Sequence, residues 1–290
     1  MADPLQAPNV VSFPEAGSRP KLLDQVRYAI RTRHYSRRTE QAYVDWIRRY
    51  IFFHNKKHPS TMGAPDIARF LSWLATARRV SSSTQNQALS ALLFLYKHVL
   101  GIEVQAIKQV PRAKMPHRVP VVLSLEEVGK ILKHMQGTMW LVAALLYGAG
   151  LLLQECLELR VKDIDFDQRQ IVVRRGKDQK DRLTMLPIAL EERLKTHLQD
   201  VKRQHERDLA EGFGRVVLPC ALDRKYPNAA TDWGWQFVFP AARICRDPQF
   251  GPPSRYHLHE SVVQRAVAEA ARQAGLTKRV GPHISRSVSA

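Results

Sequence analysis

The stretch QIVVRRGKDQKDRLTML, residues 170–186, predicts two short strands joined by a tight turn. Residues 170–174 and 182–186 are β-branched or alternate between apolar and polar side chains, whereas residues 176–181 are a glycine followed by polar and charged residues. A further short run, residues 163–166, precedes them and ends at the polar turn 167–169. The three runs predict a small antiparallel meander.

Helical patterns lie on both sides of this meander. Before it, residues 124–127 read as a capped helix start, and the apolar run 140–153 predicts a buried helix too short to cross a membrane. After it, leucines at helical spacing predict a long charged helix, and a last helix begins near Glu260 and ends at Gly275. We therefore predict a mixed α/β domain over residues 124–290, with a loop-rich insertion at about 212–260.

The N-terminal part predicts a separate lobe. Residues 1–20 carry several prolines and predict a flexible tail, and residues 21–103 predict a small basic bundle of helices at 21–32, 39–53, 64–77 and 84–100. The whole chain is then mainly α with a small antiparallel sheet. Prolines keep the linker 104–123 extended, and its basic side chains could follow DNA phosphates, although an ordinary interdomain linker is the alternative. The candidate DNA-binding residues there are Arg112, Lys114 and Arg118.

The balance of charge favours a nucleic-acid partner. Lysine and arginine number 45 against 27 aspartate and glutamate, which gives a net charge of +18 at pH 7. An excess of this kind is typical of proteins that neutralise phosphates, with a membrane surface or a charge that keeps the protein in solution as alternatives. Three scattered cysteines and the absence of an N-terminal apolar segment predict a soluble cytoplasmic protein without a membrane partner. His257-Leu-His259-Glu260 lacks the spacing of a metal site, so we predict no metal.

Two polar groups of residues could act on a phosphate. Lys177 lies in the turn of the predicted hairpin, where it could donate a proton to a departing oxygen, although the turn alone could be only a solvated charged loop. His283 and Arg286 would lie one turn apart on a helix and could hold a phosphate. Neither group is specific by itself.

The combination of these motifs resembles the tyrosine recombinases. A glycine-rich segment before a helix, Gly-Lys-x-x-Lys-Asp-Arg on a hairpin and Gly-Pro-His-x-x-Arg follow one another as in that family, and residues 83–96 resemble its helical, SAM-like core-binding domain. The likeness covers about residues 21–286. Residues 226–229, 233–236, 238–240, 247–248 and 257–260 resemble the extra segment of the integron integrases.

This resemblance implies a reaction and a set of residues. In the family a tyrosine attacks a DNA phosphate without a metal or nucleotide cofactor, while arginines, a histidine and a lysine stabilise the transition state. The matching residues are Lys177 as general acid, His283 and Arg286. The extra segment reads unpaired bases of a folded single-stranded cassette site, and double-stranded attachment sites are also bound. Its matching residues are Trp235, Pro248, Tyr256 and His257.

The sequence departs from the family pattern at two points. Leu152 stands where the family has its first arginine, and no tyrosine follows Tyr256. We therefore expect an integron integrase-like DNA-binding protein that is truncated before the nucleophile and catalytically inactive. Its last helix should be partly uncovered around Val262, Val263 and Val267, as should residues 151–153, and the family's tetramer on DNA is doubtful here. The alternatives are a truncated copy of an active enzyme and a non-enzymatic occupant that blocks an intact integrase.

Overall fold

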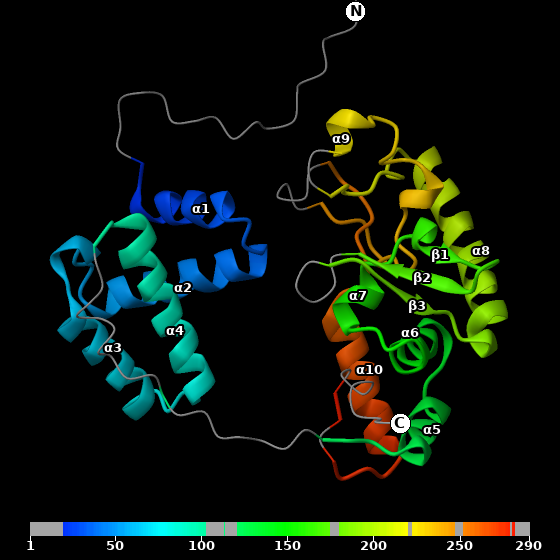
Figure 1. The fold of residues 1–290 in the computed structure, drawn as a ribbon, viewed down its shortest axis with the longest axis horizontal. Coiled ribbons are helices and arrows are strands. Elements are labelled where there is room, and N and C mark those ends of the chain that lie inside the picture. The colour runs from blue at the N-terminus through cyan, green and yellow to red at the C-terminus, as the bar shows by residue number, and fades with distance from the viewer. Residues whose placement is uncertain are drawn as a thin grey trace, which may run out of the picture. The chain divides into compact units, whose positions relative to one another are not determined.

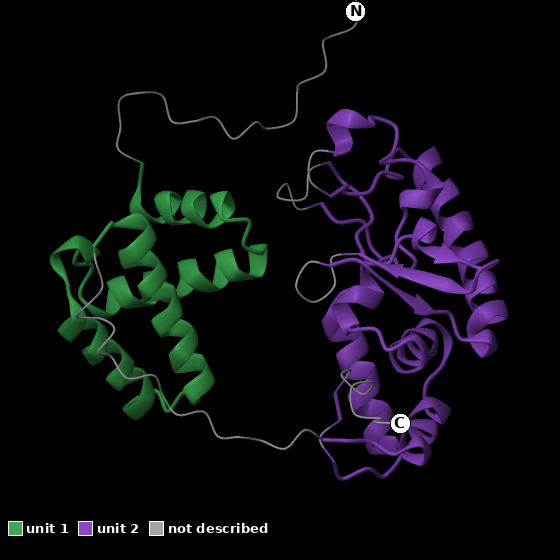
Figure 2. Ribbon diagram, in the orientation of Figure 1, with its two compact units in different colours: residues 1–118 green, residues 119–290 purple. Residues whose placement is uncertain are grey.

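The computed structural model describes residues 20–102, 113, 121–174, 180–219, 222–246, 252–278 and 280–281. The chain divides into two compact units, Met1–Arg118 and Val119–Ala290 (Figure 2). Of the predicted linker 104–123, only residues 113 and 121–123 are among the described residues.

The first unit is helical, as predicted. Its helices are α1 (Leu22–Thr32), α2 (Arg37–Phe53), α3 (Ala64–Thr76) and α4 (Ser82–Phe94), with a π-helical turn η2 (Leu95–Val99) and a 3-10 turn η1 (Pro59–Thr61) (Figure 1). Ser36 and Ser81 cap α2 and α4, because each hydroxyl accepts a hydrogen bond from the backbone N–H three residues later. The predicted helix 84–100 thus begins slightly earlier and finishes in the wider π turn.

A buried pair of tyrosines ties this unit together. The hydroxyls of Tyr50 on α2 and Tyr96 on η2 lie 3.0 Å apart, and the Tyr96 hydroxyl also lies 3.1 Å from the Pro59 carbonyl oxygen. Both side chains are fully buried. The pair joins α2, η2 and η1 and satisfies polar groups inside an otherwise apolar core.

The second unit contains the predicted meander. Strands β1 (Ile164–Asp165), β2 (Gln170–Val173) and β3 (Arg182–Met185) form one antiparallel sheet in the order β1-β2-β3, with Val173 opposite Arg182. The surrounding helices are α5 (Leu125–Lys133), α6 (Gly137–Gly148), α7 (Leu153–Leu157), α8 (Ile188–Ala210), α9 (Leu222–Lys225) and α10 (Glu260–Gln273), and the 3-10 turns are η3 (Val161–Asp163) and η5 (Trp233–Trp235) (Figure 1). The prediction of a mainly α fold with a small antiparallel sheet is confirmed.

The expectation that the last helix is partly uncovered is wrong for two of its three valines, since Val262 is partly exposed but the other two are not. Val263 and Val267 of α10 are 0% exposed, because α10 packs against α5, α6 and α7. Leu151 and Leu153 are also buried, in the same core. None of the described helices is long and apolar enough to span a bilayer.

Candidate nucleic-acid interface

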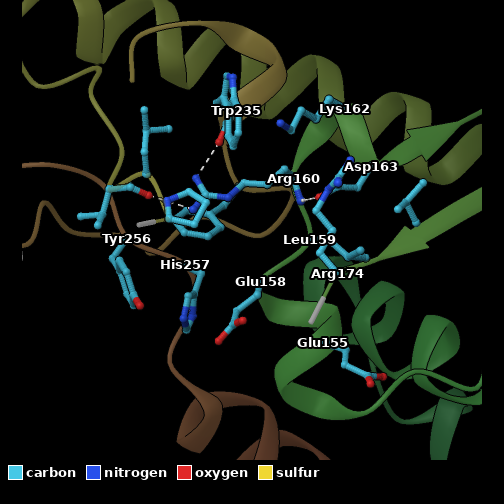
Figure 3. A pocket seen from close by; sticks show the side chains of 15 residues that line it. Glu155, Glu158, Leu159, Arg160, Lys162, Asp163, Arg174, Trp235, Tyr256 and His257 are labelled. Atoms are coloured by element: carbon cyan, nitrogen blue, oxygen red, sulfur yellow. Dashed lines mark hydrogen bonds and ion pairs between the residues drawn. The ribbon is translucent and has the colours of Figure 1, made fainter. Parts of the chain in front are cut away.

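A polar and aromatic hollow opens on the second unit between η3, β2 and the loop-rich segment before α10. Its volume is about 240 Å³, and Figure 3 shows the side chains around it. Basic, acidic and aromatic side chains line its wall. They include Arg160, Lys162, Arg174, Glu155, Glu158, Asp163, Trp235, Phe237, Tyr256 and His257.

Arg160 fixes the two walls of the hollow to each other. Its Nη1 donates to the Trp235 carbonyl oxygen at 2.7 Å and its Nη2 to the Val217 carbonyl oxygen at 2.9 Å. Its guanidinium carbon lies 3.8 Å from the centre of the Phe237 ring. Burial lowers the pKa of Arg160 to about 10, so the side chain is charged at neutral pH. The hollow therefore keeps a fixed positive charge in its wall.

One face of Trp235 is covered by a cation. Lys162 Nζ lies 2.8 Å from the centre of the Trp235 ring, and burial lowers the pKa of Lys162, as does the neighbouring Arg174. Trp235 is the last residue of η5, and the Asp232 carboxylate caps the start of this turn by accepting the Gly234 N–H at 2.7 Å. A planar ligand would stack on Trp235 either by displacing Lys162 or on the other face of the ring.

Tyr256 and His257 form a second aromatic surface. Their rings lie 4.2 Å apart and are tilted by 35°. His257 Nδ1 lies 2.8 Å from the Leu258 carbonyl oxygen, and since a carbonyl can only accept, Nδ1 carries the proton. Burial lowers the pKa of His257, so the ring is neutral at pH 7 and its Nε2 is an acceptor. Figure 3 shows Glu158, another acceptor, beside His257.

A buried ion pair positions this aromatic surface. Arg255 Nη2 donates to Asp208 Oδ1 of α8 at 2.7 Å, and Arg255 Nη1 donates to the Ala241 carbonyl oxygen at 2.7 Å. The Ala241 N–H in turn donates to the Tyr256 carbonyl oxygen at 2.7 Å. Sequence reasoning missed Arg160, Asp208 and Arg255, because each looks like one of many surface charges until its partner is known.

The surroundings of Leu152 differ from those of an apolar core position. Its N–H donates to Glu155 Oε2 at 2.8 Å, and the same carboxylate accepts from Arg182 Nη1 and Nη2 at 2.7 Å each. Glu155 is 7% exposed and Arg182 is 39% exposed. The hydrogen bonds to Glu155 raise the pKa of Arg182. A guanidinium thus lies beside residue 152, although it comes from β3.

Several predicted site residues lie outside the described residues. They are Lys177, His283, Arg286, Pro248, Arg112, Lys114 and Arg118. The structure does bring together Trp235, Tyr256 and His257, which all line the hollow.

Comparisons with known proteins give consistent matches along the chain. The family model described as "Phage integrase family" matches residues 122–290, and "Phage integrase, N-terminal SAM-like domain" matches residues 22–106. An integrase/recombinase from Escherichia coli is 47% identical over 266 residues, which are 92% of this chain and 79% of the relative. A tyrosine recombinase XerA from Thermococcus kodakarensis is 31% identical over 176 residues, 60% of each protein.

The solved structures share the fold. A lambda integrase tetramer bound to a Holliday junction matches with a TM-score of 0.56 at 14% identity, over 89% of this chain and 64% of that one. A XerH recombinase bound to its difH substrate matches with a TM-score of 0.54 at 18% identity, over 91% of this chain and 70% of that one.

Proposed function

Because the chain belongs to the phage integrase family, we propose that it acts in site-specific DNA recombination as an integron integrase-like protein that binds cassette and attachment sites. One observation carries the proposal: Trp235, Tyr256 and His257 line a single hollow whose wall also holds Arg160 and Lys162. Aromatic rings around a hollow, with cations beside them, suit unpaired bases and their phosphates. The net charge of +18 supports a polyanionic ligand.

The hollow fits a base that stands out from a folded single strand. Such a base offers a π-face to Trp235 or Tyr256, and its edge offers donors to the acceptor nitrogen of His257. We also propose that Pro248 contacts the unpaired base and that Arg112, Lys114 and Arg118 contact the phosphates of the flanking duplex. A matched duplex keeps its bases paired and stacked, so it presents no unpaired base to the hollow.

We expect Trp235→Ala and His257→Ala to lower the preference for a folded cassette hairpin over matched duplex, by about 1–3 kcal/mol for loss of a stacking contact. The measurement is a pair of titrations at one salt concentration. Trp140→Ala is the matched control, because this half-buried tryptophan of α6 is covered by Arg193 of α8, whose guanidinium carbon lies 4.0 Å from the ring centre. Equal losses on hairpin and duplex would mean that Trp235 and His257 serve only the fold.

The same proposal assigns weak or absent strand cleavage to this chain. Lys177 acts as general acid and His283 and Arg286 hold the phosphate, with no metal or nucleotide. Leu152 contributes no charge and no side-chain hydrogen-bond donor at the position of the family's first arginine. The site would bind DNA through the hollow but stabilise the transition state poorly.

Position 152 also favours a second function, occupation of DNA sites that blocks an intact integrase. Added to an active relative, the chain should lower cassette recombination as it fills the sites, and Trp235→Ala should relieve this inhibition. Recombination yield against concentration of the added chain is the measurement. Full recombination with every site occupied would exclude a blocking role.

A further inference from the structure

We propose that Arg182 is a DNA-binding residue that contacts a backbone phosphate beside residue 152. The inference rests on the proposed function, because it assumes that the second unit binds DNA on this side of the hairpin. It adds a phosphate contact from strand β3 next to Leu152.

The position of Arg182 follows from the carboxylate it shares with the backbone. Glu155 Oε2 accepts both the Leu152 N–H, at 2.8 Å, and Arg182 Nη2, at 2.7 Å. The Arg182 guanidinium is therefore separated from the Leu152 amide by a single carboxylate oxygen, to which both are hydrogen-bonded. Two parallel bonds also fix its plane, so little side-chain entropy is left to lose when a ligand binds.

The pair presents its positive member to solvent. Glu155 is 7% exposed and Arg182 is 39% exposed, so the negative charge is covered and the guanidinium faces outward. The bonds to Glu155 use two of the five N–H donors of an arginine. The others have no hydrogen-bond partner among the described residues and can point at a phosphate oxygen.

Arg174 is fixed in a similar way, but it belongs to a different surface. Its Nε donates to Asp163 Oδ1 at 2.6 Å, and Asp163 is 3% exposed. Val173 pairs with Arg182, so these two residues share a face of the hairpin and Arg174 lies on the other face, toward the hollow. Arg182 is therefore not itself a lining residue of the hollow, although its partner Glu155 is one.

The test removes the pair without changing the charge of the protein. The double substitution Glu155→Gln with Arg182→Gln deletes one charge of each sign, and glutamine at 155 can still cap the Leu152 N–H. The matched control is Glu191→Gln with Arg169→Gln, another exposed arginine near a glutamate, with 3.6 Å between Arg169 Nε and Glu191 Oε2. Binding to a cassette hairpin is measured over a range of salt concentrations.

We expect the Glu155/Arg182 variant to bind about tenfold more weakly at low salt and the slope of log K against log salt to fall by about one. The control variant should keep the slope of the unmodified chain. In a scan of hairpins with single methylphosphonates, one neutralised phosphate should weaken the unmodified chain about tenfold and leave the Glu155/Arg182 variant unchanged.

The outcomes separate this inference from the function on which it rests. Absence of DNA binding by the unmodified chain would overturn the proposed function. Binding that depends on Trp235 but keeps the same slope and the same methylphosphonate map in the Glu155/Arg182 variant would overturn only the role of Arg182. If that variant fails to fold, Arg182→Gln alone replaces it, because the glutamine amide can still donate to Glu155 but carries no positive charge. An unchanged map in folded Arg182→Gln would likewise contradict the proposal.

Discussion

Replacing Leu152 with arginine should raise DNA strand cleavage by about 10²–10³-fold, the usual effect of one donor on a transition-state oxygen. The comparison uses fusions to the C-terminal segment of a tyrosine recombinase, so that both variants carry that family's nucleophilic tyrosine. Arg182 does not fill this role completely, since both its Nη atoms are bonded to the buried Glu155. An arginine at 152 would add donors of its own.

The structure also supplies a partner for the introduced charge. The Leu152 N–H is already within 2.8 Å of Glu155 Oε2, so a guanidinium at 152 can share that carboxylate rather than stand unpaired. Covalent protein–DNA complex formed on a suicide substrate, resolved on a denaturing gel, is the measurement. Leu152→Met is the apolar control. Equal cleavage by the fusions with leucine and arginine would show that position 152 is not the missing donor.

Local patterns were sufficient to predict the elements of the fold. The alternation in residues 170–174 and 182–186 depends only on neighbouring side chains, and it corresponds to β2 and β3. The burial of Val263 and Val267 was not predictable in this way, because it depends on helices more than a hundred residues away along the chain. Sequence alone suggested uncovered apolar groups where tertiary packing covers them.

In the candidate site, too, the contacts between residues distant in the sequence were not predictable. Trp235, Tyr256 and His257 were found by family resemblance, and the structure places them around one hollow. The cation on Trp235 was not found, since Lys162 is far from it in sequence and ordinary in context. Ion pairs such as Glu155 with Arg182 join residues 27 positions apart, and nothing in the sequence marks which charges are partners.

The Asp208–Arg255 pair connects the stability of this domain to its proposed recognition surface. Asp208→Ala should lower the free energy of unfolding by about 3–5 kcal/mol, because it leaves the Arg255 guanidinium buried without its partner. Side-chain exposure is 5% for Asp208 and 13% for Arg255, so water cannot replace the lost carboxylate fully. Denaturant unfolding monitored by circular dichroism measures the loss. A cost below about 1 kcal/mol, typical of exposed pairs, would contradict this account.

The Asp208–Arg255 pair should also make the free energy of unfolding fall at acid pH. Burial alone would raise the pKa of Asp208, but hydrogen bonds from Arg255 and Gln204 outweigh it, and the pKa is lowered in the folded protein. The stabilisation is therefore fully present above the unfolded pKa and is lost as the pH falls through the folded value. Asp208→Asn should remove this acid dependence.

Because Arg255 also holds the Ala241 carbonyl beside Tyr256, the same variant should reduce hairpin preference more than duplex binding. Unchanged preference in a folded Asp208→Asn protein would confine the pair to stability.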